Sequence, residues 1–113
     1  MALERGRLST VVQVSTGSTV GIITVANNQK VYIKSILAHG VGVSTTPSVQ
    51  VYYVPNGASA SEDNRIFDVN LSARETVLFE PSYPIVLTET GDSLQVGTGI
   101  ATCNFIIMGD KEV

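Results

Sequence analysis

The chain has 113 residues, of which 43% are hydrophobic and 15% are charged, and its formal net charge is -3. This length fits one domain with its own core, and this composition excludes an intrinsically disordered chain. Nucleic acid is disfavoured as a partner, because phosphate-binding surfaces need clustered Lys and Arg, whereas the 7 basic residues here are scattered. The single cysteine, Cys103, allows no intrachain disulfide.

Residues 1–8 include Gly6 and three charged residues and show no apolar alternation. They predict an arm outside the core, either frayed or ordered on a neighbouring subunit. They also lack the apolar stretch of a secretory signal, and no apolar run approaches the length of a membrane span. We therefore expect a soluble protein that is made in a cytoplasm and has no membrane partner.

Nine short extended runs follow, rich in Val, Ile and Thr and separated by turn residues. In most of them apolar and polar residues alternate, which is typical of half-buried strands. No segment repeats apolar residues at the spacing of a helix for long enough to form one. The predicted strands are 9–15, 20–25, 31–39, 49–54, 65–71, 76–80, 85–87, 93–96 and 101–108.

The longest run, 31–39, changes its alternation part of the way along. Val31 and Ile33 share one parity, whereas Ile36 and Ala38 have the opposite parity. This slip predicts either a β-bulge near Lys34 and Ser35 or a strand that is covered on both faces.

Many short strands with closely spaced turn signals favour an all-β antiparallel sandwich or barrel. An immunoglobulin-type sandwich is less attractive, because the chain has neither a cysteine pair nor a tryptophan. We predict a jelly roll in which the run 31–39 lies beside 101–108. The predicted organisation is an arm at 1–8, a single sandwich domain at 9–109 and a short tail at 110–113.

Residues that could carry catalysis or bind metal are sparse. His39 is the only histidine and Cys103 the only cysteine, so a zinc site of the usual type is not expected within one chain. A catalytic Cys-His pair is not expected either, because the alternation around Cys103 places it in the core. The loop carboxylates lack the dense alternation of a dedicated calcium loop. We expect no enzyme activity, no metal and no cofactor. These loop carboxylates are Glu62, Asp63, Glu89 and Asp92.

Five segments carry a resemblance to a known group of proteins: VYIKSI (31–36), the run 49–54, ETVLFE (75–80), PIVL (84–87) and GDSLQV (91–96). With these segments the chain resembles small virion structural proteins of tailed bacteriophages, over roughly residues 31–109. The resemblance implies a β-sandwich that decorates or cements the outside of a capsid, often as a symmetric oligomer at local threefold axes. It implies no active-site residues.

We therefore expect a non-enzymatic protein of the virion surface, with the major capsid protein and further copies of itself, as in a trimer, as partners. Arg5, Arg7 and Leu8 are candidate contacts of the arm with a neighbour, and Tyr52 and Tyr83 are candidate contacts of the sandwich. Tyr52 faces away from Val51 and is either exposed or covered by another surface. Two alternatives remain open: a component of the tail, neck or fibre, and a carbohydrate-binding sandwich with tyrosines in a sugar-stacking groove.

Overall fold

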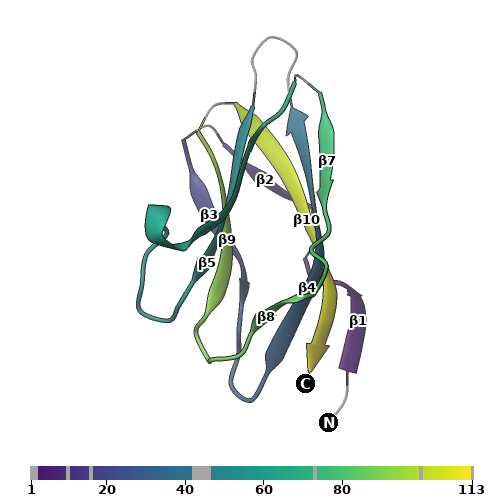
Figure 1. Cartoon of the computed structure of the whole chain (residues 1–113), viewed down its shortest axis with the longest axis vertical. Coiled ribbons are helices and arrows are strands. Elements are labelled where there is room, and N and C mark those ends of the chain that lie inside the picture. The colour runs from purple at the N-terminus through teal and green to yellow at the C-terminus, as the bar shows by residue number, and fades with distance from the viewer. Residues whose placement is uncertain are drawn as a thin grey trace.

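Two antiparallel β-sheets pack face to face in this computed structural model, which describes residues 3–9, 11–15, 17–41, 47–72, 74–99 and 101–112 (Figure 1). The predicted all-β sandwich is confirmed. Apart from strands, the described residues include a single turn of 3-10 helix, η1 (Glu62–Asn64), in a segment expected to be an exposed loop.

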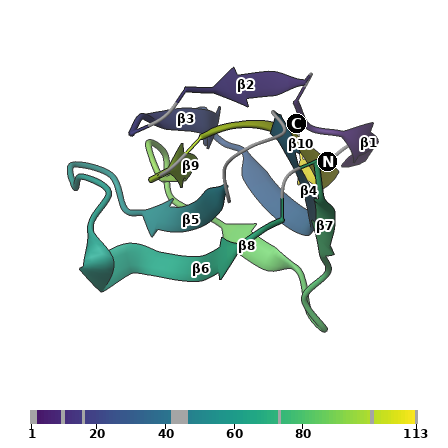
Figure 2. The ribbon, with the colours of Figure 1, turned by 90° about the horizontal axis from the view of Figure 1, so that it is seen from above.

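Sheet A is six-stranded, with the order β1-β10-β4-β7; β2 also pairs with β10, and β8 also pairs with β4. Sheet B is four-stranded, with the order β3-β9-β5-β6, and the view along the strands shows the two layers (Figure 2). The strands of sheet A are β1 (Leu3–Arg7), β2 (Val12–Val14), β4 (Lys30–Val41), β7 (Thr76–Phe79), β8 (Ile85–Leu87) and β10 (Thr102–Glu112). Those of sheet B are β3 (Thr19–Thr24), β5 (Ser48–Val54), β6 (Arg65–Asn70) and β9 (Ser93–Thr98).

The strand pairing is that of a jelly roll. Early strands pair with late ones in a nested series: β2 with β10, β3 with β9, β4 with β7 and β8, and β5 with β6. The pairs β10–β4 and β9–β5 then join this series into two sheets, as in the double Greek key. The jelly-roll prediction is confirmed, and so is the expected adjacency of runs 31–39 and 101–108, which are parts of β4 and β10.

The core lies between the sheets and consists mainly of branched aliphatic side chains. Phe105 is fully buried on β10, and Cys103 on the same strand is buried as expected. At the side of the sandwich where β6 and β7 lie, the rings of Phe67 and Phe79 meet with centroids 4.6 Å apart. Besides Phe105, the largest fully buried side chains are Ile33, Ile36, Leu87, Leu94 and Ile107.

The alternation slip in β4 is a β-bulge, one of the two alternatives that the sequence left open. Ser35 pairs with Met108 and Ile33 pairs with Gly109, so Lys34 is an additional residue with no partner position on β10. The bulge resets the parity of β4, and both Ile33 and Ile36 point into the core as a result.

The two ends of the described chain differ from the sequence prediction. Residues 1–8 were expected to form an arm, but Leu3–Arg7 forms the edge strand β1 on β10. Residues 110–113 were expected to form a tail, but β10 runs to Glu112, and Asp110 is buried and ion-paired with Lys34 at 2.7 Å. Leu3–Arg7 is held by backbone pairing, and the end of β10 is held by backbone pairing and by this ion pair. Neither interaction produces the alternation of apolar residues from which strands were predicted. Residues 1, 2 and 113 lie outside the described residues.

Candidate functional site

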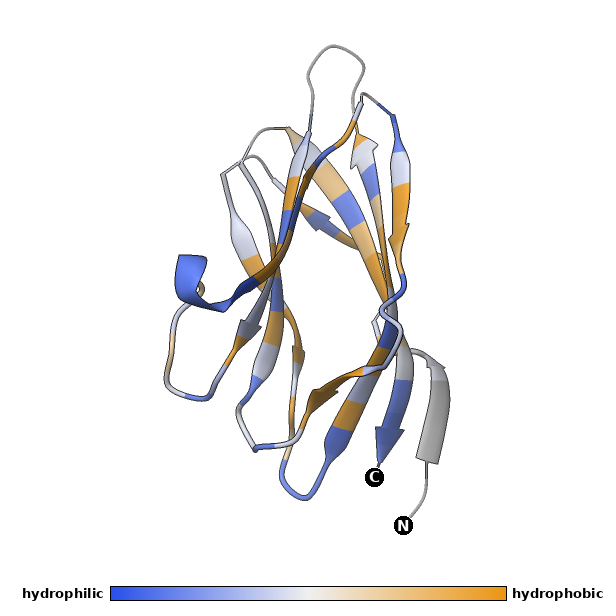
Figure 3. Ribbon diagram, viewed as in Figure 1, coloured by the Kyte–Doolittle hydropathy of each residue, from blue (hydrophilic) through white to orange (hydrophobic). Residues whose placement is uncertain are grey.

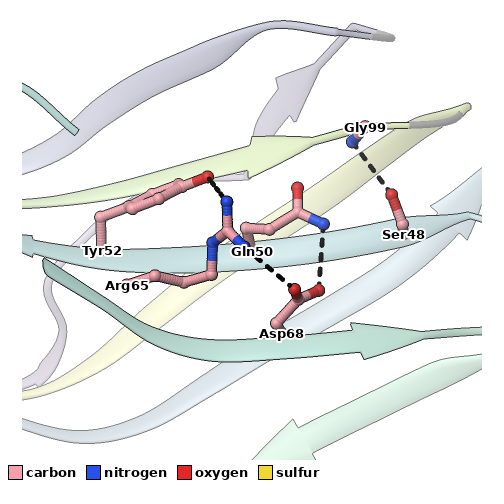
Figure 4. A network of polar contacts seen from close by, with 6 residues as sticks. All are labelled: Ser48, Gln50, Tyr52, Arg65, Asp68 and Gly99. Atoms are coloured by element: carbon pink, nitrogen blue, oxygen red, sulfur yellow. Dashed lines mark hydrogen bonds and ion pairs between the residues drawn. The ribbon is translucent and has the colours of Figure 1, made fainter. Parts of the chain in front are cut away.

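The outer face of sheet B carries a connected polar network (Figure 4). Gln50 Nε2 donates to Asp68 Oδ1 at 3.1 Å, and Arg65 Nη1 lies 3.3 Å from Asp68 Oδ2. Arg65 Nη2 donates to the hydroxyl of Tyr52 at 3.4 Å, and its guanidinium carbon lies 5.5 Å from the centroid of that ring. Farther along the sheet, the backbone N–H of Gly99 donates to Ser48 Oγ at 3.1 Å.

Arg65 covers Tyr52, which leaves the tyrosine only 8% exposed. The sequence left open whether Tyr52 is exposed or covered by another surface. In the structure Tyr52 is covered by Arg65 of the same chain. The pKa of Arg65 is raised, chiefly because its guanidinium donates to the Tyr52 hydroxyl. Tyr52 therefore offers no free ring to a sugar or a protein partner. The polar side chains of this network on sheet B bond mainly to one another. The exception is Arg65 Nε, which is buried without a hydrogen-bond partner among the described residues.

The outer face of sheet A is different, because apolar side chains cross it. Ile106 on β10, Leu37 on β4 and Leu78 on β7 occupy directly opposed positions, and we name these three residues the apolar row. Leu78 is 48% exposed, and none of the three belongs to the core cluster. Met108 follows two residues farther along β10 and is partly buried. In Figure 3, orange segments mark the apolar residues along these strands.

A polar row borders the apolar row on one side. His39 Nδ1 lies 2.7 Å from Thr76 Oγ1, and Gln13 Nε2 donates to Asn104 Oδ1 at 3.1 Å. The strand register places His39 opposite both Thr76 and Asn104, so these four residues span four strands. The only histidine of the chain is thus bonded within the sheet surface.

Charged residues border the apolar row on its other side, around the bulge. Tyr32 donates its hydroxyl proton to Glu112 Oε1 at 2.8 Å, and this bond is the main reason why the pKa of Tyr32 is raised. A shallow hollow of about 280 Å³ lies here, lined by Tyr32, Lys34, Pro84, Asp110 and Glu112. An apolar strip with polar borders has the arrangement of a protein–protein contact surface.

The remaining candidate residues lie apart from the apolar row. Tyr83, in the connection between β7 and β8, is 85% exposed and next to Pro84 of the hollow. Leu8 packs partly buried against the core of its own chain. Arg5 and Arg7 lie in β1 with their backbones opposite Asp110 and Met108, and their side chains are outside the described residues.

Sequence reasoning missed the apolar row. Its signal was present, since Leu37 and Ile106 are apolar at outward positions of strands whose inward positions, Ile36 and Ile107, are apolar as well. The position of Leu78 beside them depends on the register between β4 and β7, which is fixed only in the assembled sheet.

The described residues include no group of three His, Cys, Asp or Glu side chains placed to hold a metal ion. Asp92 is buried and orders two connections, because its carboxylate accepts the N–H of Asn56 at 2.9 Å and that of Glu89 at 3.4 Å.

Burial raises the pKa of the Cys103 thiol. No helix in the described ranges is long and apolar enough to cross a bilayer.

No protein-family model and no curated protein matches this chain. Among solved structures, the chain is similar to part of a chain in a structure of infectious bursal disease virus, Gx strain, with a TM-score of 0.41 and 10% sequence identity. The similarity covers 97% of this chain and 31% of that chain. So distant a similarity carries no argument, and the fold assignment above rests on the strand order.

Proposed function

We propose that this protein is a non-enzymatic virion structural protein that decorates or cements the outer surface of a tailed-phage capsid. The observation that carries the proposal is the contrast between the two outer faces of the sandwich. Sheet A presents the apolar row between polar borders, whereas sheet B presents a polar network that is bonded largely within itself. The resemblance of the segments between residues 31 and 109 to phage virion proteins supplies the context of a capsid.

The apolar row suits attachment because burying it removes apolar surface from water. Leu78 is 48% exposed, and covering the rest of its side chain together with Ile106 and Leu37 favours binding by roughly 25 cal/mol for each Å² removed. A single domain offers a contact of modest area, and attachment through several copies raises the effective affinity. In this proposal sheet A faces the capsid or a second subunit, sheet B faces solvent, and a trimer provides the several copies.

The carbohydrate-binding alternative is less favoured. It requires tyrosine rings that can stack on a sugar, and Arg65 covers the ring of Tyr52. Tyr83 is exposed, but Tyr53 is only partly exposed and donates its hydroxyl to the backbone carbonyl of Val86 at 3.0 Å.

Leu78→Asp tests the proposal. A carboxylate in a buried contact is costly, so the affinity for capsids purified without this protein is expected to fall at least about tenfold, measured by co-sedimentation. The matched control is Ile66→Asp, because Ile66 is 43% exposed but lies on β6 of sheet B. Thermal unfolding should show that both variants fold. Equal binding by the two variants would contradict attachment through the apolar row.

A further inference from the structure

The strand β1 is attached to the rest of the molecule in an unusual way. Among the described strands it pairs only with β10, where its five residues lie opposite the segment from Met108 to Glu112 (Figure 1). The next strand, β2, pairs with a different part of β10, from Cys103 to Phe105. β1 and β2 therefore occupy the same edge one after the other, and β1 can leave β10 while β2 stays in place.

A short connection follows β1, and its first residues are anchored at one point. The N–H groups of Leu8 and Ser9 both lie within hydrogen-bond distance of the Ile107 carbonyl oxygen, at 2.8 and 3.3 Å, and the Ile107 N–H donates to Ser9 Oγ at 3.1 Å. The Leu8 side chain lines a hollow of about 160 Å³ between the sheets, together with Ile23 and Val31. Val11 is then 58% exposed. Segment 3–9 thus combines a backbone ladder with one apolar anchor.

The middle of the β1–β10 pair is formed by two glycines. Gly6 lies opposite Gly109 and has a φ of +116°, and a Cβ atom added to it would meet no other atom within 4 Å. The contact at this point is therefore between backbones, as in the addition of a strand to a sheet edge. The register also places residues of opposite charge in opposed positions, Glu4 with Lys111 and Arg5 with Asp110. The same opposed charges meet in register whether β1 belongs to the same chain as β10 or to another copy.

We infer that segment 3–9 is exchanged between copies of this chain, so that β1 of one copy pairs with β10 of another and Leu8 lines the hollow of that second copy. Exchange breaks and forms the same hydrogen bonds and the same apolar contact, so the main cost is the entropy of association. Neighbouring copies held close together offset that cost through their high effective concentration. The inference does not depend on the capsid role, because it concerns contacts of the chain with itself.

The experiment uses two chains that both carry Cys103→Ala, which removes the native thiol. One chain also carries Glu4→Cys and the other carries Lys111→Cys, positions that lie directly opposite each other in the β1–β10 ladder. Opposed residues of antiparallel strands are close enough for a disulfide. The chains, tagged to differ in mass, are refolded together and oxidised. Exchange predicts a disulfide that joins the two different chains.

The matched control replaces Gln13 and Asn104, which are opposed in the β2–β10 ladder, by cysteine in separate chains. This pair should give no mixed disulfide, because Val14 of β2 is fully buried in the core and keeps β2 in its own chain. A mixed disulfide at the β1 position alone supports exchange. The inference is overturned if the β1 position also gives none, while a chain with both Glu4→Cys and Lys111→Cys closes its own disulfide.

The unmodified protein gives a second readout. Chains labelled with ¹⁴N and ¹⁵N are refolded together and coupled with a carbodiimide, which joins a carboxylate to an amine. Exchange predicts cross-linked peptides in which Glu4 and Lys111 come from chains of different isotope. Peptides of a single isotope only would overturn the inference. Capsids take no part in either experiment, so a failure here is separate from a failure of the attachment test.

Discussion

Replacing Gly109 by alanine is expected to lower the free energy of unfolding by about 3 kcal/mol, or to prevent folding. Gly109 lies opposite Ile33 at the β4 bulge. A Cβ atom here would collide with the carbonyl oxygen of Tyr32 and lie 3.0 Å from its carbonyl carbon. Both are backbone atoms of a central strand, so relief requires the bulge to move. Urea unfolding followed by circular dichroism measures the loss.

Gly21→Ala is the control for this prediction. Gly21 lies on the edge strand β3, where the nearest atom to a new Cβ would be Gln95 Cγ at 3.7 Å, an ordinary contact. Its free energy of unfolding is expected to change by less than about 1 kcal/mol. Equal losses for the two variants would show that close packing at the bulge does not set the stability.

Phe105→Ala is expected to cost about 3–5 kcal/mol of unfolding free energy. Phe105 is fully buried on β10, and its neighbours in register are Val12 on β2 and Ala38 on β4. The small side chain of Ala38 leaves room for the ring beside it and is too small to fill the cavity that remains when the ring is removed. Chemical denaturation with a fitted m-value measures the cost.

Phe105→Leu is the matched control, because it keeps most of the apolar volume and is expected to cost about 1.5 kcal/mol. Each cost is compared at an unchanged m-value, so that the difference reports on the native state. If Phe105→Ala cost no more than Phe105→Leu, the space between the sheets would not be close-packed at its centre.

Sequence reasoning predicted the parts of the fold that depend on burial. The opposite parities of Ile33 and Ile36 predicted either a bulge or a strand covered on both faces, and the structure shows the bulge, which lets both residues face the core. The short alternating runs likewise predicted, in approximate position, nine of the ten strands that the described residues form. The number and spacing of these runs predicted a sandwich or a barrel, and the jelly roll was the preferred arrangement among these.

The remaining features depend on neighbours that are distant in the sequence. β1 is held by pairing with β10, and neither its composition nor its alternation distinguishes it from an arm. The end of β10 carries Asp110, whose burial is made possible by Lys34 on another strand. Tyr52 is covered by Arg65 because β5 and β6 pair with a register shift that a sequence pattern does not reveal.

The copy number of this protein in purified virions distinguishes decoration of the capsid from a role in the tail, neck or fibre. Decoration of a capsid surface requires a regular ratio to the major capsid protein, whereas a tail, neck or fibre component is present in few copies. Quantitative mass spectrometry of intact particles, with labelled peptides of both proteins as standards, measures this ratio. Decoration predicts a copy number comparable to that of the major capsid protein. A handful of copies per particle would contradict it.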